Sequence, residues 1–219
     1  TAGRHSTDTH CMNILVTAGP MREYLDTVRF ISNASSGKMG YACAAAAAET
    51  GHAVTLISGP VALETPAGVE RVDAVTVADM REALVRHFPH CDALLMAAAV
   101  GDFTVDRPAG HKIPRAEGPV EILLTPTEDL LAEVVAPMRK QQTVVGFAVE
   151  DDADEEKAYR EMVAKGCDYM VINAPAAMAT DDSDACVISR DGIVLPWQRR
   201  AKPVLARELI QLTERQSQT

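Results

Sequence analysis

Short apolar runs alternate with longer amphipathic segments along this chain. Five runs are apolar almost throughout and lack the in-and-out alternation of a half-exposed strand, so they predict strands that are buried on both faces. These runs are residues 12–17, 53–57, 93–96, 143–148 and 169–173. Helices are predicted at residues 37–49, 78–88, 128–139, 153–165 and 203–214. Strands that alternate with helices of this length are typical of βαβ units.

This order of elements predicts an α/β fold with a three-layer, Rossmann-like, mostly parallel sheet and helices on both faces. Ligands of such sheets bind at the carboxyl ends of the strands, near the point where the strand order reverses. Residues able to contact a ligand fall at those ends: Gly19, Asn33, Asp102, Phe147 and Asn173. We therefore expect the functional site at this edge of the sheet.

Weaker patterns predict the remaining elements. Residues 21–26 carry mixed charge and predict a loop, and short strands are expected at 28–31, 70–75 and 120–124. The turn Arg190-Asp191-Gly192 predicts a hairpin of the segments 186–189 and 193–196. Proline and glycine interrupt residues 104–119, so we predict a single domain over residues 12–219 with a mobile flap at about 102–124.

Capping residues set the expected helix ends. Thr127 is predicted to cap the helix at 128–139. Gly51 and Gly166 are predicted to end the helices before them, since glycine readily adopts the left-handed conformation of that position. Residues 1–11 are polar and patternless and precede Met12, so we expect a disordered arm or a tag remnant there.

Residues 29–40, RFISNASSGKMG, connect an apolar strand to an alanine-rich helix. One interpretation is a capped helix start, with Ser35 or Ser36 as the cap and Gly37 in the turn. Free N–H groups at a helix start also form a ready anion site. Capping alone does not require Arg29 and Asn33, so the sequence favours a phosphate or carboxylate site.

Composition narrows the classes of function. The chain has 219 residues, 47% of them hydrophobic, and a formal net charge of −10. An acidic protein lacks the basic face that non-specific nucleic-acid binding needs, so no nucleic-acid partner is expected. The five cysteines form no C-x-x-C pair, which indicates neither a zinc site nor a disulfide framework. Such cysteines are simplest in a reducing setting, so we expect a cytoplasmic protein. No apolar run has the length of a bilayer, so we expect no membrane partner.

Two common nucleotide motifs are missing. The first strand ends in T-A-G-P, with one glycine where a dinucleotide fingerprint needs three, and no G-x-x-x-x-G-K-[ST] loop follows any strand. Single residues have ordinary interpretations too: Asp102 as a turn residue, Lys112 as a solvated charge, Phe147 as core packing. Gly146 beside Phe147 would let a flat base approach closely, and a lysine on a flap such as Lys112 can close over a phosphate.

Several motifs and single residues occur together in one order: TAG (17–19), Arg22, Asp26 with VR (28–29), SNASSGKMG (32–40), AAAVGDF (97–103), a lysine at 112, VVGFAVE (144–150) and Asn173 at the end of a later strand. As an ordered set they closely resemble phosphopantothenate–cysteine ligase of the bacterial, CTP-dependent type. The resemblance covers residues 12 to about 214. It implies a ligase of coenzyme A synthesis, either free-standing or one half of a longer enzyme.

The resemblance implies two half-reactions. The carboxylate of 4′-phosphopantothenate attacks the α-phosphate of CTP and releases pyrophosphate, and the amine of L-cysteine then opens the acyl-cytidylate and releases CMP. A carboxylate is inert to amines until one of its oxygens becomes a good leaving group, which explains the nucleotide. The resemblance also implies Mg²⁺ to neutralise the triphosphate, and a homodimer.

Residue roles follow from the resemblance alone. Asn33 and Lys112 match the catalytic residues, the first holding the acyl-nucleotide and the second acting from the flap. The matches to substrate-binding positions are Arg29, Ser35, Ser36, Gly37, Ala98 and Ala99. The matches to nucleotide-binding positions are Gly19, Asp102, Lys112, Glu128, Asp129, Leu130, Phe147 and Lys165.

Some positions depart from the family pattern. The usual K-x-K-K of the flap is K-I-P-R at 112–115, Pro20 replaces a glycine, and Glu161 stands where a second triphosphate lysine is expected. These changes reduce the positive charge of a site meant for a triphosphate. A divergent paralogue that joins another acid and amine, or a non-catalytic nucleotide-binding homologue, are the alternatives that remain.

Overall fold

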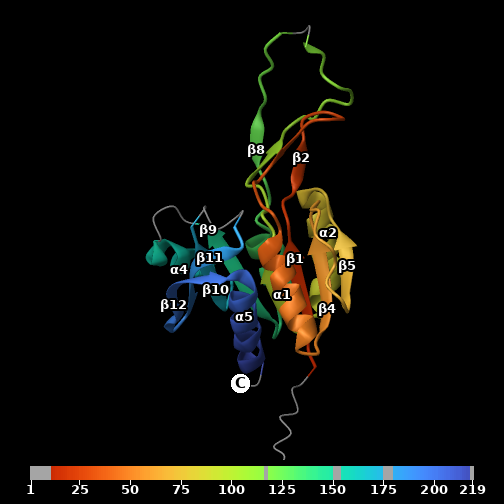
Figure 1. Cartoon of the computed structure of the whole chain (residues 1–219). Helices are drawn as coiled ribbons and strands as arrows, with labels where there is room; N and C mark the ends of the chain where they lie inside the picture. The colour runs from red at the N-terminus through yellow and green to blue at the C-terminus, as the bar shows by residue number, and fades with distance from the viewer. Residues whose placement is uncertain (1–10, 116–117, 150–153, 175–179, 218–219) are drawn as a thin grey trace, which may run out of the picture.

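The computed structural model describes residues 11–115, 118–149, 154–174 and 180–217. Its centre is an eight-stranded sheet (Figure 1) in the order β12-β11-β10-β9-β6-β1-β4-β5. The strands are β1 (Asn13–Ala18), β4 (Ala53–Ser58), β5 (Val69–Asp73), β6 (Ala93–Met96), β9 (Thr143–Val149), β10 (Tyr169–Asn173), β11 (Asp182–Ser189) and β12 (Gly192–Ala201). All five predicted buried strands are confirmed within two residues at each end.

Six neighbouring strands, β5-β4-β1-β6-β9-β10, are parallel. In chain order they run 3-2-1-4-5-6, which is the order of the Rossmann fold, and the order reverses between β1 and β6. The predicted α/β, mostly parallel class is therefore confirmed. The predicted hairpin is also present, and its strand β11 adds antiparallel to β10 and extends the sheet.

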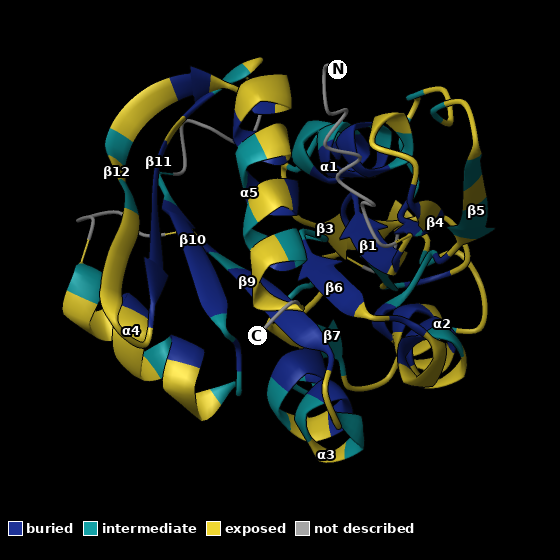
Figure 2. Cartoon of the chain, turned by 90° about the horizontal axis from the view of Figure 1, so that it is seen from below, coloured by how far each residue is buried: buried dark blue, intermediate teal, exposed yellow. Residues whose placement is uncertain are grey.

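Helices cover both faces of the sheet (Figure 2), and α1 (Lys38–Glu49) and α5 (Lys202–Gln216) lie together on one of them. The other face carries α2 (Val77–His87), the π-helix η3 (Leu130–Val135) with α3 (Ala136–Met138), and α4 (Glu155–Ala164). Alternate β1 residues enter different cores, Ile14 and Val16 towards α1 and α5 and Leu15 towards α2. Burial on both faces is why β1 reads as a continuous apolar run.

The helix ends confirm some capping predictions and correct one. Gly51 and Gly166 follow α1 and α4 with φ of 88° and 67°. Thr127 was predicted to cap the next helix, and this prediction is wrong. Asp129 is the cap, because its side chain accepts the N–H groups of Leu131 and Ala132 at 3.1 Å, and the segment 130–135 forms a π-helix rather than an α-helix.

Two short hairpins form an extension that projects from the carboxyl edge of the sheet (Figure 1). One pairs β2 (Arg22–Tyr24) with β3 (Phe30–Ser32), and the other pairs β7 (Phe103–Val105) with β8 (Leu124–Pro126). Residues 22–24 are thus a strand where a loop was predicted, and the returning strand starts at 124 rather than at 120. The chain between β7 and β8 is the predicted flap, of which residues 116–117 lie outside the described part.

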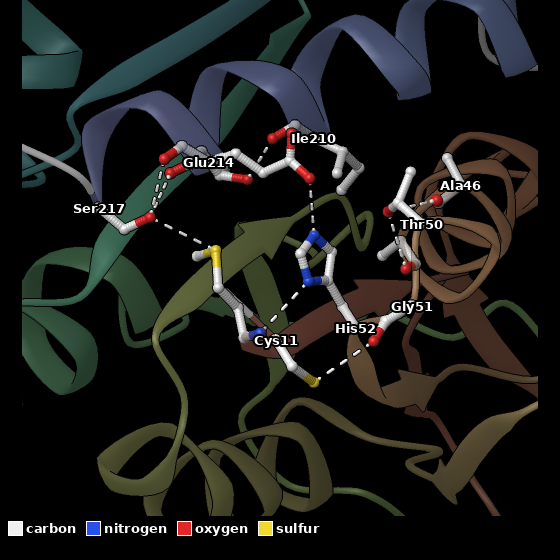
Figure 3. Close-up of polar contacts among 11 residues, drawn as sticks. Cys11, Ala46, Thr50, Gly51, His52, Ile210, Glu214 and Ser217 are labelled. Atoms are coloured by element: carbon white, nitrogen blue, oxygen red, sulfur yellow. Dashed lines mark hydrogen bonds and ion pairs between the residues drawn. The ribbon is translucent and has the colours of Figure 1, made fainter. Parts of the chain in front are cut away.

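His52 ties three segments together at the opposite edge of the sheet (Figure 3). Its ring is buried; Nδ1 accepts the N–H of Met12 at 3.2 Å, and Nε2 lies 3.0 Å from a carboxylate oxygen of Glu214. Because Nδ1 is an acceptor, Nε2 carries the proton and donates to Glu214. The loop after α1, the start of β1 and the end of α5 therefore share one side chain.

His52→Ala should lower the free energy of unfolding by about 2–3 kcal/mol, because it leaves the buried Met12 N–H without an acceptor and opens a cavity. Urea unfolding followed by circular dichroism measures the change. Glu214→Gln is the matched control: the amide oxygen still accepts from Nε2, so we expect a loss below about 1 kcal/mol. Equal losses for the two variants would contradict this account.

No helix in the described ranges is both long and apolar enough to cross a membrane.

Candidate functional site

A cavity of about 720 Å³ opens at the carboxyl ends of the central strands, where the strand order reverses. Its wall contains twelve of the residues that sequence analysis assigned to a site. These are Asn33, Ser35, Ser36, Gly37, Ala98, Ala99, Asp102, Glu128, Asp129, Leu130, Phe147 and Lys165. Segments that are up to 132 residues apart in the chain, from Asn33 to Lys165, therefore meet around one space.

The turn before α1 forms one side of the cavity. Gly37 precedes the helix in the left-handed conformation, with φ of 76°, and a Cβ there would lie 3.0 Å from Val61 and 3.4 Å from Gly19. Among the described residues no side chain caps α1; Ser35 instead accepts the N–H of Gly37 at 3.3 Å. The predicted serine cap is therefore wrong, and the uncapped first turn suits an anion.

Asn33 joins this turn to the segment that follows β6. Its amide nitrogen donates to the carbonyls of Ala99 (3.4 Å) and Val100 (3.3 Å). The alanines are held from behind, because Ala98 N–H donates to the Thr17 hydroxyl at 3.0 Å and Ala99 N–H to the Gly19 carbonyl at 2.9 Å. Gly19 thus supports the cavity wall without being part of its lining.

Lys165 lies on the α4 side of the cavity, between two carboxylates. Its Nζ is 2.5 Å from Glu161 and 3.5 Å from Asp129. Burial favours the neutral amine, but the hydrogen bond and the charge of Glu161, followed by those of Asp129, outweigh it and raise the pKa of Lys165 above its ordinary value. The lysine is charged, and a polyphosphate would have to displace its present partners.

The segment before η3 is fixed to the start of the extension. Thr127 donates its N–H to the Asp102 carbonyl at 2.9 Å and its hydroxyl to the Gly101 carbonyl at 2.5 Å. Glu128 is paired with Arg81 at 2.7 Å. Asp102 is exposed at the cavity wall, where its carboxylate can contact a ligand. This part of the wall can contact a ligand through both carboxylates and backbone.

Phe147 is half-buried at the cavity wall and packs against the core that α1 and α5 cover. Gly146, the residue before it, was expected to leave space for a flat base. This expectation is wrong. A Cβ on Gly146 would meet Cys167 at 3.0 Å and Met170 at 3.1 Å, so close packing between β9 and β10 explains this glycine. A ligand can reach the Phe147 ring itself.

Two predicted residues, Arg29 and Lys112, are in the described part of the chain but outside the cavity lining. Arg29 is paired with Asp26 at 2.5 Å, and Lys112 is an exposed residue of the flap. Both belong to the extension, which stands beside the cavity mouth. The structure does not bring these two residues together with Asn33.

Three lysines of the lining were missed by sequence analysis: Lys38, Lys157 and Lys202. Lys38 Nζ is 2.6 Å from Asp181, and Lys202, which is only 5% exposed, donates to the Thr180 carbonyl at 2.5 Å. Burial, followed by the charge of Lys38, lowers the pKa of Lys202 below its ordinary value. Lys38 and Lys202 could have been found by their position, since each is the first residue of a helix.

The cysteine residues of the chain are not part of this site. None of the five cysteines, all of which are described, lines the cavity. Burial raises the pKa of Cys43, Cys91 and Cys167 to about 12 in each case, so these thiols stay protonated and unreactive at neutral pH. The described cavity lining offers hydrogen-bond donors and lysines, and no thiol.

Comparison with known proteins agrees with this geometry. A "Cysteine/Cysteine sulfinic acid decarboxylase" of an unknown prokaryotic organism is 37% identical over 202 residues, 90% of this chain and 56% of that protein. The "Coenzyme A biosynthesis bifunctional protein CoaBC" of Bacillus subtilis is 37% identical over 200 residues, 89% of this chain and 48% of that protein. The chain thus spans about half the length of these relatives.

A solved structure covers nearly the whole chain. The crystal structure of the C-terminal domain of the coenzyme A biosynthesis bifunctional protein CoaBC superposes with a TM-score of 0.79 and 34% identity, over 94% of this chain and 95% of that one. Residues 9–216 match the family described as the DNA/pantothenate metabolism flavoprotein C-terminal domain. With the fold, the cavity and both comparisons in agreement, the chain belongs to this family.

Proposed function

We propose that the chain is a phosphopantothenate–cysteine ligase that uses CTP and proceeds through an acyl-cytidylate. The observation that carries the proposal is the convergence, around one cavity, of Asn33, the turn at 35–37 and Lys165. A related protein named for coenzyme A biosynthesis supports the pathway. The first half-reaction must bring a carboxylate and a nucleotide together, and one shared cavity provides for this.

The residues divide into two groups by their place on the wall. Asn33 and the uncapped turn at 35–37 would hold the acyl phosphate, because amide and N–H donors stabilise the charge that develops on its oxygens. The small side chains of Ala98 and Ala99 would let the pantothenate arm run close to the backbone. Lys165, Asp102 and Phe147 would hold the nucleotide. Fixing both substrates in one cavity supplies the proximity that an amide-forming step needs.

Mg²⁺ fits this proposal as a companion of the nucleotide. Among the described residues, no three His, Cys, Asp or Glu side chains converge as a metal site. Mg²⁺ commonly binds through one or two carboxylates together with substrate phosphates, and Asp102 in the cavity wall is a carboxylate of that kind. The ion would neutralise triphosphate charge when bound.

Pyrophosphate release tests the proposed function. Purified protein with CTP and Mg²⁺ should release pyrophosphate only when phosphopantothenate is present, and should form the amide and CMP only when L-cysteine is added as well. ATP in place of CTP tests the choice of base. Release without phosphopantothenate, or no release with any nucleotide, would reject the ligase. Formation of an acyl-nucleotide that only another amine consumes would indicate a paralogue.

We further propose that the ligase is a homodimer and that the extension forms its interface. Large apolar side chains are exposed there: Phe30 on β3, Phe103 on β7, and Leu123, which comes just before β8 and is 70% exposed. An apolar surface of this kind usually marks a site of protein association. Sedimentation equilibrium should give twice the monomer mass, and a monomer at micromolar concentration would reject the interface.

Glu161→Gln should lower the KM for CTP by about fivefold, which is close to 1 kcal/mol of binding energy. The substitution removes the carboxylate 2.5 Å from Lys165, so only Asp129, at 3.5 Å, still competes with phosphate for the lysine, and one repulsive charge is lost. Glu156→Gln is the matched control, because Glu156 is on the same helix, pairs with Arg160 at 4.0 Å and is not part of the cavity wall. Steady-state kinetics with varied CTP measures both; an unchanged KM for Glu161→Gln would remove Lys165 from the phosphate site.

A further inference from the structure

The Asp26 side chain is fully buried at the turn of the β2–β3 hairpin and accepts five hydrogen bonds. Oδ1 accepts the N–H groups of Val28 (2.8 Å) and Arg29 (2.7 Å). Oδ2 accepts the N–H of Ile113 (3.1 Å) and two nitrogens of the Arg29 guanidinium, Nε at 2.9 Å and Nη2 at 2.5 Å. One carboxylate thus joins two segments that are 87 residues apart.

Arg29 completes the link from its other side. Its Nη2 also donates to the Ile113 carbonyl at 2.7 Å, so both backbone groups of Ile113 are bound by the Asp26–Arg29 pair. A hydrogen bond from Ala109 N–H to the Leu25 carbonyl, at 2.9 Å, holds the same flap segment against the turn of the β2–β3 hairpin. We call Asp26, Arg29 and Ile113 the flap clamp.

The turn alone does not explain these contacts. An aspartate that only stabilises a turn accepts N–H groups two and three residues ahead, which here are Val28 and Arg29. The contacts to Ile113 are additional and reach the flap. The Arg29 N–H, against the effect of burial and with further help from Val28 and Ile113, holds the pKa of Asp26 well below its ordinary range. The clamp therefore stays charged at every pH at which the enzyme would work.

We propose that Asp26 is a positioning residue that fixes Ile113 and, through it, sets the place from which the adjacent Lys112 reaches a bound nucleotide; this rests on the proposed function. An anchored flap has few conformations before the nucleotide binds. Less conformational entropy is therefore lost when Lys112 contacts the phosphates. Arg29 acts within the clamp rather than at the cavity wall, which explains why it lies outside the lining.

Hydrogen exchange and kinetics on Asp26→Asn test the proposal together. Asparagine has the same size but offers one acceptor oxygen and no charge, so the amides of the peptide that covers 109–113 should exchange at least tenfold faster while those of β1 and β6 keep their rates. The value of kcat should fall about tenfold with a smaller change in the KM for phosphopantothenate. Asp26→Glu restores the charge and should recover part of kcat.

Two further variants distinguish loss of the clamp from a general effect of substitution in the extension. Arg29→Lys alters a side chain that is 49% exposed, so the fold should survive, and it removes the donor to the Ile113 carbonyl; it should speed exchange at 109–113 as well. Asp106→Asn is the control, since Asp106 is in the same extension and pairs with its neighbour Arg107 at 3.2 Å. It should change neither exchange at 109–113 nor kcat.

The outcomes separate the clamp from the proposed function. Unchanged exchange at 109–113 in Asp26→Asn would overturn the clamp. Faster exchange with wild-type kcat would overturn the positioning role. If the wild-type protein releases no pyrophosphate, the proposed function fails, and the exchange comparison alone decides whether the clamp exists.

Discussion

Asn33→Asp should lower kcat for amide formation by about 100- to 1,000-fold, the usual cost of losing one donor to a developing oxyanion. The amide nitrogen of Asn33 lies at the cavity wall between the turn at 35–37 and the alanines that follow β6. A carboxylate at this place has no N–H to donate. It also brings a negative charge next to the acyl phosphate, where negative charge develops on the carbonyl oxygen and on the leaving CMP when the amine attacks.

The fold should be unaffected by this change. Asn33 is exposed, and its bonds to the Ala99 and Val100 carbonyls are long, at 3.4 and 3.3 Å, so their loss should cost less than about 1 kcal/mol. Thermal unfolding followed by circular dichroism checks this. Asn13→Ser, which changes an exposed asparagine at the opposite end of β1, serves as the activity control.

Single-turnover measurements identify the affected step. Pyrophosphate release reports formation of the acyl-nucleotide, and product formation after addition of cysteine reports its use. We expect Asn33→Asp to slow amide formation more than pyrophosphate release, because the interaction is assigned to the bound intermediate. Wild-type rates in both steps would remove Asn33 from the mechanism, and the cavity would then need another donor for the acyl phosphate.

The fold can be predicted from sequence where the local pattern and the tertiary environment agree. The five buried strands were found because both faces of a parallel sheet are covered, so neighbouring residues such as Ile14 and Leu15 are apolar for different cores. The glycines at the helix ends were found because their positive φ is a local requirement. Twelve assigned residues meet at the cavity because strand ends converge at one edge.

Residues whose deciding contact comes from a distant segment cannot be assigned in this way. Thr127 and Asp129 are both good capping residues, and only the tie of Thr127 to Gly101 and Asp102 shows which one caps η3. Arg29 resembles a substrate ligand in sequence, yet its partners are Asp26 and the backbone of Ile113. Neither choice can be made from spacing, because the competing residues are equally suited locally.

The second large effect is expected on stability. Gly40→Ala should lower the free energy of unfolding by about 2 kcal/mol: overpacking costs up to about 3 kcal/mol and the better helix propensity of alanine returns about 1 kcal/mol. Gly40 is in the first turn of α1, which crosses β1 closely. A Cβ there would lie 2.5 Å from the Cβ of Ala18 and 2.7 Å from the Thr17 carbonyl oxygen.

Both of these contacts are rigid, so relief requires movement of the helix itself. The start of α1 carries the turn at 35–37, and Thr17 also accepts the Ala98 N–H, so such movement would widen the cavity wall. We therefore expect the midpoint of thermal unfolding to fall by about 4–8 °C, for a domain of this size, together with weaker substrate binding. Differential scanning calorimetry and the KM for phosphopantothenate measure the two effects.

Two comparisons separate close packing from a general effect of alanine. Gly110→Ala should be neutral, because no described atom lies within 4 Å of a Cβ at Gly110. Ala18→Gly removes the nearer clashing atom, so the double variant with Gly40→Ala should be more stable than the sum of the single changes predicts, by about 1 kcal/mol of coupling. Strict additivity would mean that α1 and β1 are not in the close contact that shapes this side of the cavity.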